Sequence, residues 1–173
     1  MDDICNILYT SGTTGDSKGV ILTYGQYLAA MIANDEVVPI KEKDRIINFL
    51  PFTHIFERGW TYLCLTEGCL LIINTYPKEI QQSMRETHPT CMSSVPRFWE
   101  KVYIGVKERM EEASPIQRKL FNHALAVGHK HNVEYLSRCK RPPIALQLEY
   151  KMLNKTVMSL VRKQLGLENA HFF

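Results

Sequence analysis

The sequence predicts an α/β fold with a mostly parallel sheet of about five strands, crossover helices and a long all-helical excursion over about residues 97–166. Two observations lead to this prediction. Up to residue 96, short apolar runs rich in β-forming residues alternate with helical stretches, which is the pattern of βαβ units. From residue 97 to 166 the spacing is helical, and no convincing strand interrupts it.

The predicted strands are apolar runs that end at a turn or a proline. The run over residues 69–74 is almost continuously apolar, as expected for a strand covered on both faces. The last residues of the chain, 170–173, have the character of the beginning of a fifth strand. The four complete strands are expected at residues 4–10, 45–50, 69–74 and 90–95.

Helix-initiating and helix-terminating residues separate these strands. Thr23 and Gln26 have the spacing of a capping box and open a helix toward Val38. A second helix is expected over about residues 55–66, ended by Gly68. Pro77 fits the first turn of a third helix, which runs to residue 88.

Prolines divide the helical excursion. Ser114 and Pro115 are a cap and first-turn pair that restarts a helix. Residues 141–143, Arg-Pro-Pro, interrupt the pattern again. The last long helix is expected over residues 146–165, with Gly166 as its end.

Composition and charge exclude several classes of protein. The 173 residues carry 21 Lys and Arg against 18 Asp and Glu, and these charges are scattered rather than clustered into a nucleic-acid-binding face. No apolar run is long enough to span a membrane, and no secretion signal precedes Asp2. The five cysteines form no CxxC pair, which favours reduced thiols in a cytoplasmic protein. The basic residues 138–141 are best interpreted as a solvated loop, with weak peripheral membrane contact as the lesser alternative.

Residues 10–19, Thr-Ser-Gly-Thr-Thr-Gly-Asp-Ser-Lys-Gly, form the segment most informative about function. Glycines and hydroxyl side chains between a predicted strand and a predicted helix allow backbone N–H groups to converge on an anion, with Lys18 as a mobile positive charge. The segment is not a Walker A loop, because Ser17 stands where that motif needs glycine. A flexible turn is the alternative, although a turn needs neither the hydroxyls nor the lysine.

Residues 9–20 resemble the phosphate-loop signature of the adenylate-forming, or AMP-binding, enzymes. Residues 50–58, Leu-Pro-Phe-Thr-His-Ile-Phe-Glu-Arg, and residues 94–101, Ser-Val-Pro-Arg-Phe-Trp-Glu-Lys, are similar to stretches of the long-chain fatty-acid–CoA ligase (acyl-CoA synthetase) subgroup. One departure is Ser17, which replaces the proline usual before the loop lysine and makes the loop less rigid. The resemblance spans the chain, as a partial AMP-binding domain over residues 1–173.

The resemblance implies an ATP-dependent ligase that uses Mg²⁺ and takes coenzyme A as co-substrate. His54 would be catalytic, beside the fatty-acid carboxylate and the α-phosphate. The hydroxyl of Thr10 would also face the metal ion. The residues implied to hold the ATP phosphates are Thr10, Ser11, Gly12, Thr13, Thr14, Gly15 and Lys18.

Several neighbouring residues keep two interpretations. Glu57 and Arg58 are either an ordinary exposed pair or structural residues that fix the loop around His54. Trp60 and Trp99 are packing residues or part of an acyl channel, and Arg97 has the same two alternatives.

The sequence thus predicts a fragment of the N-terminal region of a long-chain fatty-acid–CoA ligase, whose substrates are ATP, a fatty acid and coenzyme A. The family's adenine-binding and ribose-binding stretches and its C-terminal lysine are expected beyond Phe173, so the isolated chain should be inactive. Uncovered apolar surfaces should also make it self-associate. Another adenylate-forming enzyme, specific for amino or aryl acids, and a non-enzymatic scaffold remain the alternatives.

Overall fold

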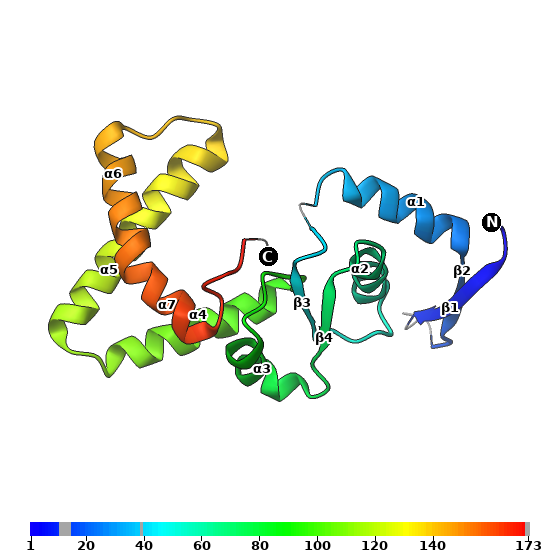
Figure 1. Cartoon of the computed structure of the whole chain (residues 1–173). Helices are drawn as coiled ribbons and strands as arrows, with labels where there is room; N and C mark the ends of the chain where they lie inside the picture. Colours follow the sequence, from blue (N-terminus) through cyan, green and yellow to red (C-terminus); the bar gives the residue numbers. More distant parts are fainter. Residues whose placement is uncertain (11–14, 39, 172–173) are drawn as a thin grey trace. The chain divides into compact units, whose positions relative to one another are not determined.

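The computed structural model of the chain describes residues 1–10, 15–38 and 40–171. The chain divides into two compact units, one of residues 1–94 with 169–173 and the other of residues 95–168. All strands of the described residues lie in the first unit, and the second is helical (Figure 1). The predicted α/β class is therefore confirmed. Among the described residues, no helix is both long and apolar enough to cross a membrane.

The first unit begins with an antiparallel hairpin of β1 (Ile4–Thr10) and β2 (Lys18–Thr23), in which Thr10 lies opposite Lys18. This corrects the expectation that the glycine-rich loop leads from a strand directly into a helix. Residues 20–22, Val-Ile-Leu, are β-forming and pair back onto β1. The hairpin is a two-stranded sheet of its own, so β1 is not part of the parallel sheet.

Helix α1 (Tyr24–Asp35) follows β2 directly and begins as predicted. The hydroxyl of Thr23 accepts from the backbone N–H of Gln26, and the Gln26 side chain accepts from the backbone N–H of Thr23. The capping box is therefore confirmed, and the helix ends three residues before the predicted Val38.

A three-stranded parallel sheet forms the centre of this unit. It contains β3 (Arg45–Asn48), β4 (Leu70–Ile73) and β5 (Cys91–Met92) in the order β4-β3-β5. Helix α2 (Ile55–Thr66) connects β3 to β4, and the short η1 (Pro77–Glu79) with α3 (Ile80–Thr87) connects β4 to β5. These are the crossover connections that the alternating pattern predicted.

Among the described residues the parallel sheet has three strands rather than the predicted five or so. Three predicted strands pair in parallel, each over a shorter range than expected. The fourth, β1, belongs to the hairpin. Ala170 and His171 are not in a strand, although the backbone N–H of His171 donates to the carbonyl of Thr90, and residues 172–173 lie outside the described residues.

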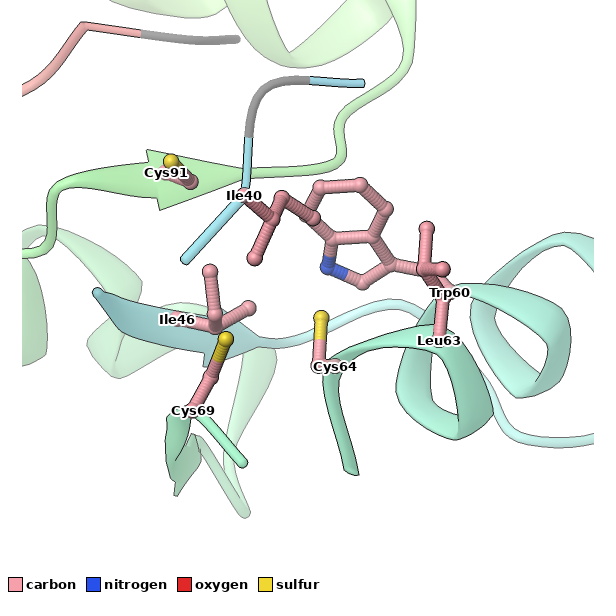
Figure 2. Packing of buried hydrophobic residues seen from close by; sticks show 7 residues of the cluster. All are labelled: Ile40, Ile46, Trp60, Leu63, Cys64, Cys69 and Cys91. Atoms are coloured by element: carbon pink, nitrogen blue, oxygen red, sulfur yellow. The ribbon is translucent and has the colours of Figure 1, made fainter. Parts of the chain in front are cut away.

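The core of the first unit lies between the sheet and α2. Figure 2 shows how Ile46 of β3 and Cys91 of β5 face Trp60, Leu63 and Cys64 of α2. Ile46, Cys64 and Cys91 have no exposed surface. All five cysteines of the chain are free, and burial raises the pKa values of the Cys64 and Cys69 thiols, which keeps them protonated.

The second unit consists of consecutive helices. Helix α4 (Pro96–Glu111) is followed by α5 (Pro115–His129), which Ser114 caps in the predicted way. A π-helical turn η2 (Lys130–Tyr135) and a 3₁₀ turn η3 (Leu136–Arg138) extend α5. After prolines 142 and 143, α6 (Ile144–Leu153), the π-helical turn η4 (Asn154–Met158) and α7 (Ser159–Leu165) run in sequence to Gly166, whose φ is +76°. The core of the second unit joins α5 to α6 through Ala124, Val127, Leu146 and Leu153.

Candidate nucleotide and substrate site

The β1–β2 hairpin presents the predicted phosphate-binding residues at its open end. Thr10 and Lys18 form the last pair of the ladder, and the Thr10 hydroxyl donates to the Lys18 carbonyl at 3.4 Å. Both residues are exposed. Ser11, Gly12, Thr13 and Thr14 lie outside the described residues.

Two glycines of this segment stand where a larger residue would be disfavoured, for different reasons. Gly15 has a φ of +111°, a conformation that residues with a Cβ rarely adopt. At Gly19 a Cβ would lie 3.0 Å from the Cγ2 of Ile7 and 3.4 Å from the ring of Tyr9, because these side chains cross over it. Tyr9 and Ile7 therefore cover Gly19 at the base of the loop.

His54 lies at the start of α2, on the connection that follows β3. It is the N-cap residue of the helix, but its side chain makes no capping hydrogen bond. Its backbone N–H donates to the carbonyl of Pro51 at 3.0 Å, which fixes the turn, and the imidazole is exposed. This is the carboxyl end of the parallel strands, where open α/β sheets bind ligands.

Glu57, one turn into α2, is completely buried. The hydroxyl of Ser93, just after β5, donates to its Oε2 at 3.1 Å. The backbone N–H groups of Leu50 and Phe49, just after β3, also lower the pKa of the carboxyl, whereas its Oε1 atom has no hydrogen-bond partner among the described residues. Burial raises the pKa of this carboxyl, and these hydrogen bonds lower it by less. Glu57 therefore joins the ends of two strands to the helix that carries His54.

Arg58 also bonds to the connection between β3 and α2. Its Nε and Nη2 atoms donate to the carbonyl of Phe52 at 3.1 and 2.9 Å. Of the two interpretations of the Glu57 and Arg58 pair, the structure supports the one in which they fix the loop. The alternative of an exposed pair is wrong, because one member is buried and each bonds to different groups.

A polar cluster that the sequence did not reveal completes this end of the sheet. The side-chain amide of Asn48, the last residue of β3, donates to the hydroxyl of Thr61, which in turn donates to the carbonyl of Glu57. Asn48 is 1% exposed and Thr61 is 6% exposed. The one signal in the sequence is an asparagine that ends an apolar strand; its partner on α2 is thirteen residues away and has no local signature.

An apolar groove of about 330 Å³ is lined from Ile55 onward, the residue that follows His54 in sequence. The first two residues of α2, Ile55 and Phe56, line one side of it, and both are half exposed. Gly59 leaves room on the helix surface between them and Trp60. Its remaining lining residues are Tyr27, Ala30, Met31, Asn34 and Leu63.

The predicted site residues thus fall into two groups within the first unit. Thr10, Gly15 and Lys18 lie at the end of the hairpin, and His54 lies at the end of β3. Among the described residues, no hydrogen bond or ion pair links the two groups.

The remaining candidates have structural surroundings. Trp60 packs in the core and also lines the groove. Trp99 packs edge-on against Phe98, with ring centroids 5.0 Å apart, and Arg97 forms an exposed ion pair with Glu100 at 2.8 Å.

Comparison with known proteins identifies relatives of this chain. Three curated relatives are long chain acyl-CoA synthetase 3 of Arabidopsis thaliana, the long-chain-fatty-acid–CoA ligase ACSBG2 of Rattus norvegicus and the putative fatty-acid–CoA ligase fadD11 of Mycobacterium tuberculosis. They are 30%, 31% and 33% identical over 92%, 96% and 95% of this chain. The chain spans 25%, 26% and 29% of their lengths.

Solved structures also resemble part of this chain. The inhibitor-bound N-terminal domain of FACL13 from Mycobacterium tuberculosis matches 56% of this chain and 25% of its own, with a TM-score of 0.51 and 26% identity. The o-succinylbenzoate CoA synthetase MenE of Bacillus subtilis, in complex with its acyl-adenylate intermediate, matches 60% of this chain and 28% of its own, with a TM-score of 0.53 and 26% identity. Because residues 1–147 also match the family model described as AMP-binding enzyme, the chain belongs to the AMP-binding enzyme family.

Proposed function

We propose that this chain is part of a long-chain fatty-acid–CoA ligase, which activates a fatty acid with ATP and transfers the acyl group to coenzyme A. In the first step a carboxylate oxygen attacks the α-phosphorus of ATP, forming acyl-adenylate and releasing pyrophosphate. In the second the coenzyme A thiol attacks the acyl carbon, forming the thioester and releasing AMP. The observation that carries the choice of substrate is the apolar groove that begins at Ile55 and Phe56, directly after His54.

The hairpin end would hold the ATP phosphates. The exposed Lys18 supplies a positive charge, and Gly15 has a positive φ of +111°, which glycine adopts more readily than other residues. The proposal for Ser11, Gly12, Thr13 and Thr14 rests on the motif alone. Thr10 and Lys18 would contact only the nucleotide. Their contribution to the reaction would therefore be the same for every acyl substrate.

Mg²⁺ fits the same end of the hairpin. The Thr10 hydroxyl uses its proton on the Lys18 carbonyl, which leaves its oxygen lone pairs for a hard cation. Bound Mg²⁺ would neutralise the phosphate charge that pyrophosphate carries away.

His54 would act on the carboxylate side of the reaction. Its imidazole is exposed at the carboxyl end of the sheet, and its backbone is held by Pro51. Glu57 and Arg58 contact neither substrate in this proposal. They hold the connection from Phe49 to Phe52 and so fix where His54 stands, which matters because catalysis depends on groups positioned together.

The test is steady-state kinetics on a full-length protein that contains this chain, with ATP and fatty acid varied separately. Lys18→Ala should lower kcat/KM for ATP at least about tenfold at every acyl chain length, because a hydrogen bond to a charged group contributes about 1.5–3 kcal/mol. His54→Ala should instead lower the rate of acyl-adenylate formation.

Lys43→Ala, an exposed lysine of the same unit, and His123→Ala, an exposed histidine of the second unit, are the matched controls and should leave both parameters unchanged. Unchanged kinetics in Lys18→Ala and His54→Ala would remove both residues from the site. Activity with amino or aryl acids but not with fatty acids would show a different adenylate-forming enzyme.

A further inference from the structure

A second cluster of chemically reactive side chains lies at the other end of the parallel sheet. Asp44 immediately precedes β3, Cys91 is the first residue of β5, and His171 belongs to the segment that follows α7 in sequence. All three lie in the first unit. Asp44 is 3% exposed and Cys91 is fully buried, while the His171 side chain is 46% exposed. Ser93 and Glu57 mark the opposite end of the strands, so this cluster is separate from the site described above.

One nitrogen faces both other groups. The Nε2 atom of His171 lies 2.9 Å from the Oδ1 atom of Asp44 and 3.4 Å from the Sγ atom of Cys91. The three atoms lie within 4.8 Å of one another. A neutral imidazole carries one proton on one of its two nitrogens, so Nε2 can donate to only one of these partners at a time. A cation in place of that proton and the thiol proton would satisfy all three groups together.

The separation of the nitrogen and sulfur atoms matches that of a tetrahedral zinc site. Zinc–nitrogen bonds of about 2.0 Å and zinc–sulfur bonds of about 2.3 Å place a nitrogen and a sulfur ligand about 3.5 Å apart. The observed distance from His171 Nε2 to Cys91 Sγ is 3.4 Å. Thiolate and imidazole ligands favour Zn²⁺ over Mg²⁺ or Ca²⁺, which prefer oxygen ligands.

Further hydrogen bonds hold the two carboxylate oxygens and the histidine backbone. The Thr90 hydroxyl donates to Asp44 Oδ1 at 2.7 Å, and the backbone N–H of Lys41 donates to Asp44 Oδ2 at 2.8 Å. The backbone N–H of His171 donates to the carbonyl of Thr90 at 2.9 Å. Such outer contacts orient metal ligands, and here they preset the carboxylate and the segment carrying the histidine.

We propose that Asp44, Cys91 and His171 bind one Zn²⁺ ion. The fourth position faces solvent beside the exposed side of His171 and holds a water molecule. Binding releases the thiol proton of Cys91 to solvent, and His171 binds through Nε2 with its remaining proton on Nδ1. The ion ties residue 171 to the start of β3 and β5, which lie far from it in sequence.

The test uses the purified chain stripped of metal and titrated with Co²⁺, whose thiolate complexes absorb in the near ultraviolet. One equivalent should bind with this absorption, and Zn²⁺ should displace it. Because loss of an outer-shell partner alone costs about 10–100-fold in metal affinity, Cys91→Ser and His171→Ala should each weaken binding by at least about 100-fold. Cys91→Ser should also abolish the thiolate band.

Cys64→Ser, another fully buried thiol of the same core, and His123→Ala, an exposed histidine, are the controls and should bind as the unaltered chain does. His171→Ala alters a half-exposed side chain, so its fold should survive, and circular dichroism verifies this. Absence of a stoichiometric thiolate band, or a band that survives in Cys91→Ser, overturns the proposal. Binding that is insensitive to His171→Ala does the same. None of these readouts depends on catalytic activity, so the proposal stands or falls separately from the proposed function.

Discussion

Replacing Glu57 with glutamine should change how the stability of the chain depends on pH. Burial raises the pKa of Glu57 above its ordinary value of 4.5, although its hydrogen bonds oppose this. Folding therefore favours the protonated form. The stability that this preference contributes is complete below pH 4.5 and is lost as the pH rises through the raised pKa.

The size of the change in the free energy of unfolding depends on the difference between the folded and unfolded pKa values of Glu57. Each unit by which the folded pKa exceeds the unfolded one costs the wild-type chain about 1.4 kcal/mol at high pH, and Glu57→Gln has no such cost. The glutamine carbonyl can still accept from Ser93. Glu57→Ala instead leaves the Ser93 hydroxyl without this acceptor, so it should lower the free energy of unfolding by about 1–3 kcal/mol at every pH.

The assay is urea unfolding at pH values from about 4 to about 8, a range across which such linkage is expressed. Trp99→Phe in every variant leaves Trp60, one turn from Glu57 on α2, as the sole tryptophan to report on the first unit. Glu79→Gln, at an exposed position of the same unit, controls for the change in net charge. The reasoning is refuted if wild type and Glu57→Gln change in parallel over this range, or if alanine is tolerated as well as glutamine.

Three further results are expected. Ile46→Ala, at a fully buried position of β3, should lower the free energy of unfolding by about 2–5 kcal/mol in the same assay, and a loss below that range would mean that the core collapses around the cavity. Gly68→Ala should cost about 1–2 kcal/mol because φ is +71° there, and a neutral result would show that the turn relaxes. The chain should self-associate in light scattering over a concentration series, because Leu70 and Ile73 are exposed on the edge strand β4; a constant monomeric mass would contradict this.

Local signals in the sequence were sufficient for most of the elements. Thr23 with Gln26 and Ser114 with Gln117 form reciprocal side-chain and backbone bonds within four residues, so their effect does not depend on the rest of the fold. Helix α2 has the predicted bounds for the same reason, since Gly68 can adopt the positive φ that ends it. Where a segment's conformation is decided by neighbours in sequence, the prediction holds.

Pairing over longer distances decided the rest. The strand β2 is short and follows a glycine-rich loop, and it forms because β1 is available as a partner. The burial of Glu57 depends on Ser93, thirty-six residues away, and nothing near Glu57 indicates it. Asp44, Cys91 and His171 meet only because β3, β5 and the segment after α7 come together, which no local pattern encodes.

We propose that this chain provides the phosphate-binding and carboxylate-side residues of a fatty-acid-activating enzyme. The most direct measurement is ATP–pyrophosphate exchange by a full-length protein containing the chain, with and without a long-chain fatty acid and Mg²⁺, alongside Lys18→Ala. We predict exchange that requires both the fatty acid and Mg²⁺ and that falls at least about tenfold in Lys18→Ala, while the isolated chain gives none. Exchange that ignores the fatty acid, or that is unchanged in Lys18→Ala, would contradict the claim.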